Sequence, residues 1–282
     1  MNTANPTPED VSANGRFQRP SRRDVPQMFD RISATYDLLN RILSFGTDVL
    51  WRRKVARFLP LRRNQRVLDL ATGTGDQILA LFEESHRVGF GVGIDPAQKM
   101  LEIGRLKIRK RGLSNRITLM VGDATAIPLD DGQFDAVTIA FGIRNIGDVK
   151  KALQEIYRVL KPGGRVIVLE FAMPGNRLLR AGVLAYLRHI LPCLGAWVSR
   201  DRHAYRYLNK TIETFPSGEA FCDLLRGARF TGVTGHSVPL GLPMIYKGER
   251  PVERLRQRLR TGATYGASSG RDQSPLAHPS LS

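Results

Sequence analysis

The sequence predicts an α/β fold built on a doubly wound, parallel sheet. Short apolar runs typical of buried strands alternate with helical patterns from about residue 65 to residue 175. A glycine-rich turn follows the first of these runs directly, as it does after the first strand of many doubly wound folds. Strands that alternate with helices at this spacing are expected to run parallel.

The elements follow one another in a regular order. Five strands are expected at residues 66–70, 88–95, 117–122, 134–141 and 165–172. Helices are expected between them, from about Gln77, from Pro96 to about Arg111, and from Lys150 to Leu160. Proline favours the first position of a helix, and the sequence Lys-Pro-Gly-Gly is expected to end the third helix. Further helices are expected at about 177–198, 202–215 and 217–227, and further strands at 231–238 and 242–246.

Polar segments flank this pattern at both ends. Residues 1–25 are rich in Pro, Asn and Arg, and residues 250–282 begin as a basic stretch and end in Gly, Ser and Pro. Because such segments bury little apolar surface, a mobile arm and a disordered tail are expected. One domain is therefore expected over residues 26–249, with a helical insertion at about 176–216.

The chain has a formal net charge of +17, which indicates an anionic partner such as nucleic acid or an anionic membrane. Residues 67–175 contain 14 basic and 13 acidic residues, a net charge of +1. Residues 16–66 carry +9 and residues 176–210 carry +6. The excess charge therefore lies in the segments that flank a nearly neutral centre.

Cysteine spacing and hydropathy predict a cytoplasmic protein. Cys193 and Cys222 have no metal-binding or redox spacing, which suits a reducing compartment. No apolar run is long enough to span a bilayer, and the polar N-terminus does not resemble a secretory signal. No His, Cys, Asp or Glu cluster has metal-ligand spacing, so no metal is expected.

The loop "DLATGTGDQ", residues 69–77, is a candidate nucleotide site. Gly73 and Gly75 allow a tight turn and a close approach of a ligand to the backbone. A glycine loop alone is often only a turn, but Asp95 follows at the end of the second predicted strand, where a carboxylate accepts hydrogen bonds from ribose hydroxyls. Ile78 stands where loops that bind NAD or FAD need a small residue, so these dinucleotides are disfavoured.

A third feature favours S-adenosylmethionine as the cofactor. Asp123 follows the third predicted strand and suits an adenine amino group, while the backbone N–H of Ala124 suits a ring nitrogen. Asp123 also suits a helix cap, but its register with Asp95 and the glycine loop favours the cofactor.

The sequence "AFGIRNIGD" places Arg144 and Asn145 at the end of the fourth predicted strand. One interpretation is that Asn145 caps the helix that begins near Gly147 and that Arg144 is solvated, and the local sequence alone favours it. The other interpretation is that both side chains face a bound substrate.

Several segments between residue 28 and about residue 247 resemble the ubiquinone/menaquinone biosynthesis C-methyltransferase family (UbiE/MenG-like). They are "MFDRISATYDLLNRILSFGTDVLWRR", "VLDLATGTGD", "GIDPAQKML", "FGIRNIGD", "ALQEIYRVLKPGGRVIVLEF" and "YRYLNKTIETFP". The glycine loop and "LKPGG" occur in many methyltransferases, whereas the first segment and "FGIRN" are more specific. The resemblance implies a Rossmann-like, seven-stranded class I S-adenosylmethionine-dependent methyltransferase with a helical N-terminal cover. It also implies C-methylation of a polyprenylated quinol, either demethylmenaquinol, a ubiquinol precursor or both.

The resemblance implies cofactor contacts at Thr74, Asp95, Asp123 and Ala124. Ala140 replaces a serine that is frequent in the family, so it is not counted among these contacts.

Carbon methylation also indicates roles for the polar residues near the fourth strand. A quinol ring carbon is a poor nucleophile until a neighbouring hydroxyl loses its proton. Arg144 is therefore expected to stabilise the phenolate, and Asn145 to orient a hydroxyl or a water molecule. Tyr36 is a third catalytic candidate. His189 and His203 are isolated in basic helical stretches, which favours structural or surface roles.

Residues 177–198 combine apolar side chains with Arg177, Arg180 and Arg188. A core helix with one basic face is the commoner case, but a lipid-soluble quinol favours an amphipathic segment on the inner face of the membrane.

Two other functions stay open. The charge suits an S-adenosylmethionine-dependent RNA methyltransferase, although no RNA-binding module is evident. The second is a non-catalytic subunit of a quinone-synthesis complex. As to assembly, a homo-oligomer is also compatible with the sequence.

Overall fold

A seven-stranded sheet forms the centre of the protein. The computed structural model describes residues 24–186, 188, 202–238 and 242–252. Its strands are β1 (Gln65–Leu70), β2 (Val88–Asp95), β3 (Ile117–Val121), β4 (Phe134–Ala140), β5 (Leu160–Phe171), β6 (Thr231–Ser237) and β7 (Pro243–Glu249). They lie in the order β3-β2-β1-β4-β5-β7-β6. The seven-stranded, Rossmann-like fold that the sequence predicts is confirmed.

The sheet is mixed rather than wholly parallel. β1 to β5 pair in parallel, whereas β7 runs antiparallel to both β5 and β6. β7 alone among these strands therefore runs against the others, and the parallel pairing predicted for the five strands that alternate with helices is confirmed. Only five residues separate β6 from β7, and a connection this short joins antiparallel neighbours, because a parallel pair needs a crossover of a dozen or more residues.

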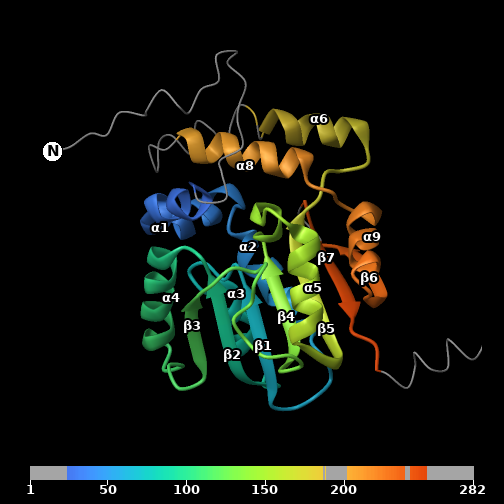
Figure 1. Cartoon of the computed structure of the whole chain (residues 1–282). Helices are drawn as coiled ribbons and strands as arrows, with labels where there is room; N and C mark the ends of the chain where they lie inside the picture. Colours follow the sequence, from blue (N-terminus) through green and yellow to red (C-terminus); the bar gives the residue numbers. More distant parts are fainter. Residues whose placement is uncertain (1–23, 187, 189–201, 239–241, 253–282) are drawn as a thin grey trace, which may run out of the picture.

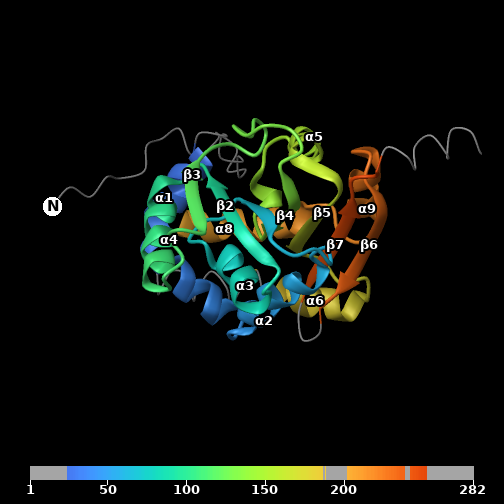
Figure 2. The ribbon, with the colours of Figure 1, turned by 90° about the horizontal axis from the view of Figure 1, so that it is seen from below.

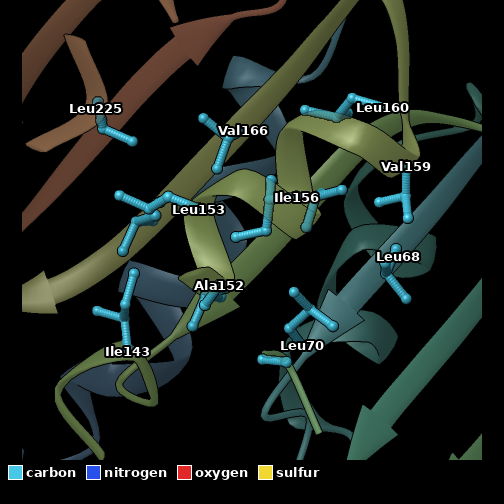
Figure 3. Packing of buried hydrophobic residues seen from close by; sticks show 14 of the residues in the cluster. Leu68, Leu70, Ile143, Ala152, Leu153, Ile156, Val159, Leu160, Val166 and Leu225 are labelled. Atoms are coloured by element: carbon cyan, nitrogen blue, oxygen red, sulfur yellow. The ribbon is translucent and has the colours of Figure 1, made fainter. Parts of the chain in front are cut away.

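Helices cover both faces of the sheet. They are α2 (Thr47–Val55), followed by the 3-10 helix η2 (Ala56–Phe58), α3 (Asp76–Glu84), α4 (Gln98–Lys110), α5 (Val149–Val159) and α9 (Glu219–Gly227). Figure 2 shows α5 on one side of the sheet and α2 and α3 on the other. Successive strand residues point to opposite faces, so Leu68 joins the cluster under α5, while Val67 joins the cluster under α2 and α3. Figure 3 shows Leu153 and Ile156 of α5 among Leu68, Val166 and their neighbours.

Two helix boundaries differ from the sequence prediction. Pro96 does not open α4, because Ala97 is the N-cap in an extended conformation and its N–H donates to the Asp95 carboxylate. The Lys-Pro-Gly-Gly sequence follows the end of α5 at Val159, but it already belongs to β5.

Three helices form a cover at one end of the sheet. They are α1 (Asp24–Leu43), α6 (Arg177–Ala185) and α8 (Arg202–Thr214), and Figure 1 shows them lying across the sheet. α6 accounts for the first part of the helix predicted at 177–198, and most of the remainder lies outside the described residues. So do residues 1–23 of the predicted arm and 253–282 of the predicted tail. None of the described helices combines the length and apolar character of a membrane span.

Candidate functional site

Two pockets adjoin each other beneath α1. The first, here called the loop pocket, lies among the loops that follow β1, β2, β3 and β4. The second, here called the apolar pocket, lies among α1, α2, α8 and the ends of β4 and β5. Phe29, Tyr36, Phe141 and Asn145 line both pockets. The two pockets therefore meet at a boundary that contains two polar side chains.

Asp95 is the central polar group of the loop pocket. It ends β2, is 8% exposed, and accepts hydrogen bonds from the backbone N–H groups of Gly73 (2.9 Å) and Ala97 (2.8 Å), one on each carboxylate oxygen. Each oxygen keeps a further lone pair for a ligand. Burial raises the pKa of Asp95 to about 6, although the backbone hydrogen bonds act in the opposite direction.

Asp123 and Ala124 line the loop pocket after β3. One carboxylate oxygen of Asp123 accepts hydrogen bonds from the N–H (2.7 Å) and the hydroxyl (2.9 Å) of Thr125. These local bonds fix the loop and leave the second carboxylate oxygen for other partners. The structure thus brings together Asp95, Asp123, Ala124 and Gly73, as the sequence predicts.

Two further residues of the glycine loop, Thr74 and Gly75, have structural roles. Gly73 lines the pocket with φ +56°, and Gly75 caps α3 with φ +80°; both angles favour glycine. Thr74 does not line the loop pocket. It is 2% exposed, and its hydroxyl donates to Asp37 of α1 at 2.6 Å and accepts from Lys107 at 2.9 Å. Contact of its side chain with a cofactor stays a prediction.

Aromatic and aliphatic side chains make up most of the apolar pocket. They include Met28, Ile32, Leu39, Trp51, Phe171, Tyr207 and Ile212. The charged side chains among its described lining residues are Asp48, Arg52 and Arg144. A cavity of this kind suits an apolar molecule that carries a few polar groups.

Arg144 lies in the short 3-10 helix η3 (Ile143–Asn145), directly after β4. Its side chain is 5% exposed, forms an ion pair with Glu170, and lies over the ring of Phe171, 5.4 Å from the ring centroid. The interpretation of Arg144 as a solvated surface residue is therefore wrong. The interpretation of Asn145 as a helix cap is wrong too, because Asp148 caps α5 by accepting a hydrogen bond from the N–H of Lys151 at 3.0 Å.

Tyr36 extends from α1 to the boundary of the two pockets. Burial raises the pKa of its hydroxyl above the ordinary value, while the positive charge of Arg52, a hydrogen bond with the Asn40 side chain and the charge of Arg144 act to lower it. The two guanidinium groups thus oppose the effect of burial on this hydroxyl without outweighing it.

Sequence reasoning missed several residues of the site. Glu170 is the last residue but one of β5 and is 1% exposed, and burial raises the pKa of its carboxyl despite the charge of Arg144. An acidic residue at the end of an apolar run was an available signal for it. The sequence around Arg52, "LWRR", contains no motif that would indicate a binding residue. Of the two isolated histidines, His189 lies outside the described residues and His203 belongs to α8.

The described residues contain no group of three His, Cys, Asp or Glu side chains that could hold a metal ion.

Comparison with known proteins identifies related sequences and folds. Residues 17–250 match the model of the ubiE/COQ5 methyltransferase family. The chain is 46% identical to a demethylmenaquinone methyltransferase of Thermus thermophilus over 224 residues, which cover 79% of this chain and 100% of that protein. It is 40% identical to a ubiquinone/menaquinone biosynthesis C-methyltransferase UbiE of Geotalea daltonii, over 80% of this chain and 96% of that protein.

Solved structures support the fold alone. A methyltransferase of Thermotoga maritima, described as a possible histamine N-methyltransferase, has a TM-score of 0.57 at 21% identity and covers 79% of this chain and 98% of its own. The [4+2]-cyclase SpnF has a TM-score of 0.56 at 19% identity and covers 83% of this chain and 98% of its own. Because one architecture serves different reactions, the residues of the site rather than the fold determine the activity.

Proposed function

The chain belongs to the ubiE/COQ5 methyltransferase family, and we propose that it methylates a polyprenylated quinol bound in the apolar pocket. S-adenosylmethionine-dependent C-methylation in menaquinone or ubiquinone biosynthesis is the activity of this family. The observation that carries the residue assignment is the shared boundary of the two pockets, where Tyr36 and Asn145 line both. A methyl donor in the loop pocket and a methyl acceptor in the apolar pocket would meet at this boundary.

The loop pocket fits S-adenosylmethionine. Asp95 has free lone pairs for two ribose hydroxyls, and Asp123 and the N–H of Ala124 suit the adenine edge. Gly73 keeps the loop close to the pocket, since a side chain there would be strained at φ +56° and would meet Met100 at 3.4 Å. When bound, S-adenosylmethionine supplies an electrophilic methyl group on a sulfonium.

The apolar pocket fits the aromatic head of a quinol and the start of its prenyl chain. Arg144 lines this pocket but not the loop pocket, which supports a contact with the methyl acceptor rather than with the cofactor. Its guanidinium favours the ionised hydroxyl, which makes the neighbouring ring carbon nucleophilic. Glu170 holds the guanidinium through an ion pair with one terminal nitrogen. Asn145 and Tyr36 are assigned to orient the hydroxyl and the water that removes its proton.

The activity can be tested with purified protein, methyl-labelled S-adenosylmethionine and short-chain acceptors that are kept reduced. A demethylated naphthoquinol and a demethylated benzoquinol should be compared. We expect the label on the ring carbon of at least one of them, and lipid extracts of a deletion strain should accumulate the same precursor. Label on an oxygen, or on neither acceptor, would refute the proposal.

Exposed apolar side chains and arginines on the helical cover suit an anionic membrane, from which a prenyl chain would enter the apolar pocket. Phe45 is 83% exposed at the end of α1, and Leu178 on α6 is 85% exposed between Arg177 and Arg180. The hydroxyl of Tyr186 donates to the carbonyl of Leu43 at 3.0 Å, which joins the ends of these helices.

Vesicle sedimentation tests this membrane proposal. The protein should bind anionic vesicles at low salt and leave them as salt rises, because surface electrostatics are screened. Leu178→Asp should weaken the binding, whereas Leu106→Asp, at an exposed position on α4, should not. Equal binding to neutral vesicles would contradict an electrostatic contact.

A further inference from the structure

The apolar pocket contains a second buried cation, to which the catalytic assignment gives no role. Arg52 lies on α2 and lines this pocket with Arg144, and its side chain is 8% exposed. Its Nε has no hydrogen-bond partner among the described residues, and it lies 3.9 Å from Asp48. A buried guanidinium that is this weakly paired is unfavourable unless a ligand completes its hydrogen bonds.

The two arginines are arranged on adjacent aromatic rings. The guanidinium carbon of Arg52 lies 5.2 Å from the ring centroid of Phe141, and that of Arg144 lies 5.4 Å from the ring centroid of Phe171. The two ring centroids are 4.7 Å apart. Both charges also act on the Tyr36 hydroxyl. Two cations therefore address the same region of the pocket.

We propose that Arg52 is a second acceptor-binding residue, which contacts the ring oxygen beside the prenyl chain while Arg144 holds the oxygen beside the carbon to be methylated. This inference rests on the proposed function. A quinol carries two oxygens on opposite sides of its ring, whereas a phenol carries one. The pair of arginines thus makes the enzyme selective for a dihydroxylated ring, and Arg52 is the residue that determines this selectivity.

A purely structural Arg52 would behave differently. Arg52 also acts to lower the pKa of the buried Asp69 and Asp76, so its loss could disturb the fold around the β1 loop. Such a disturbance would affect every acceptor equally. A contact to one oxygen affects only acceptors that carry it, and this difference separates the two roles.

The test compares two acceptors with wild-type protein and Arg52→Gln. One acceptor is a short-chain prenyl naphthoquinol, and the other is the matching naphthol that lacks only the hydroxyl beside the prenyl chain. We expect wild-type kcat/KM to be on the order of tenfold or more higher for the quinol, as a hydrogen bond to a charged group allows. Arg52→Gln should lose most of this preference by slowing the quinol reaction and leaving the naphthol reaction nearly unchanged.

Arg53→Gln is the matched control, because Arg53 is the next residue of α2, is 45% exposed and pairs with Glu84 at the surface. It should keep the full preference. Equal losses on both acceptors with Arg52→Gln would overturn the proposal. If that variant no longer binds S-adenosylmethionine, Arg52→Lys replaces it, and a preference unchanged from wild type would then overturn the proposal. Methylation of neither acceptor by the wild type would instead refute the proposed function.

Discussion

The loop pocket and the apolar pocket adjoin each other, but they are built in different ways. The loop pocket consists mainly of backbone and short side chains at the ends of four neighbouring strands. The apolar pocket consists of large side chains from elements at both ends of the described chain, from Met28 to Leu242. The loop pocket lies mainly at the carboxyl ends of the strands, whereas most of the apolar pocket is formed by the helices that cover this end of the sheet.

The two pockets also carry opposite charges. The carboxylates of Asp95 and Asp123 line the loop pocket, whereas the apolar pocket has two guanidinium groups, of Arg52 and Arg144, and one carboxylate, of Asp48. This separation suits a reaction in which a sulfonium meets a phenolate, because each charge lies near groups of the opposite sign. Substitutions in one pocket should therefore act on one substrate and spare the other.

Arg144→Ala should give the largest effect, on the acceptor side alone. Turnover should fall on the order of a hundredfold or more, as it does when a donor to a developing oxyanion is removed. Affinity for S-adenosylmethionine, measured by calorimetry, should change little. Arg144→Lys should restore part of the rate, since lysine keeps the charge but loses the planar fork. Normal turnover, or a loss of cofactor binding in proportion to the rate, would remove Arg144 from catalysis.

Asp95→Ala should weaken the binding of the cofactor and spare the binding of the quinol. It removes the acceptor of two backbone N–H groups and of the ribose hydroxyls, so S-adenosylmethionine binding should weaken by roughly 1–3 kcal/mol. The KM for the quinol, measured at saturating cofactor, should stay close to the wild-type value. A cofactor affinity that does not change in a folded variant would place the ribose elsewhere.

The pH dependence of cofactor binding should follow the Asp95 carboxyl. Its pKa of about 6 means that it becomes protonated as the pH falls through 6, and the protonated form cannot accept bonds from both hydroxyls. The Kd for S-adenosylmethionine should therefore be about tenfold higher at pH 5 than at pH 8.

Asp95→Asn serves as the control for this pH dependence. Burial also raises the pKa of Asp69 to about 6. If the pH dependence persisted in Asp95→Asn, Asp69 rather than Asp95 would be its source.

The contrast between the pockets explains which parts of the site were predictable. Asp95 and Asp123 follow strands of one parallel sheet, and the carboxyl ends of parallel strands share one edge, so spacing along the chain indicates proximity. The apolar pocket has no such rule. Trp51 and Phe171 meet there with ring centroids 6.4 Å apart, although they lie 120 positions apart in the sequence. The roles of Arg144 and Tyr36 were predicted only through family resemblance, while Glu170 and Arg52 were not predicted.

α1 is the one described element that contributes residues from several of its turns to both pockets. Lys107 of α4 links α1 to the glycine loop and to α3. The ammonium group lies 2.5 Å from Asp37 of α1, 2.6 Å from Asp76 and 2.9 Å from the Thr74 hydroxyl. A second tie runs from the N–H of Lys99 to Asp30 at 2.9 Å. Lys107→Ala would leave Asp37 and Asp76 to repel each other, and α1 would be held less closely.

The effect of Lys107→Ala should be the smallest, and it should be shared by both pockets. Partly exposed ion pairs contribute up to about 1 kcal/mol each, so affinities for cofactor and quinol should both fall a few-fold, and amides of α1 should exchange faster with solvent. Arg111→Ala is the control, because Arg111 lies one turn after Lys107 at the C-cap of α4 and pairs with Glu83 of α3 at 2.9 Å. If Lys107→Ala weakened cofactor binding alone, the lysine would act through Thr74 and the glycine loop, and α1 would not couple the two pockets.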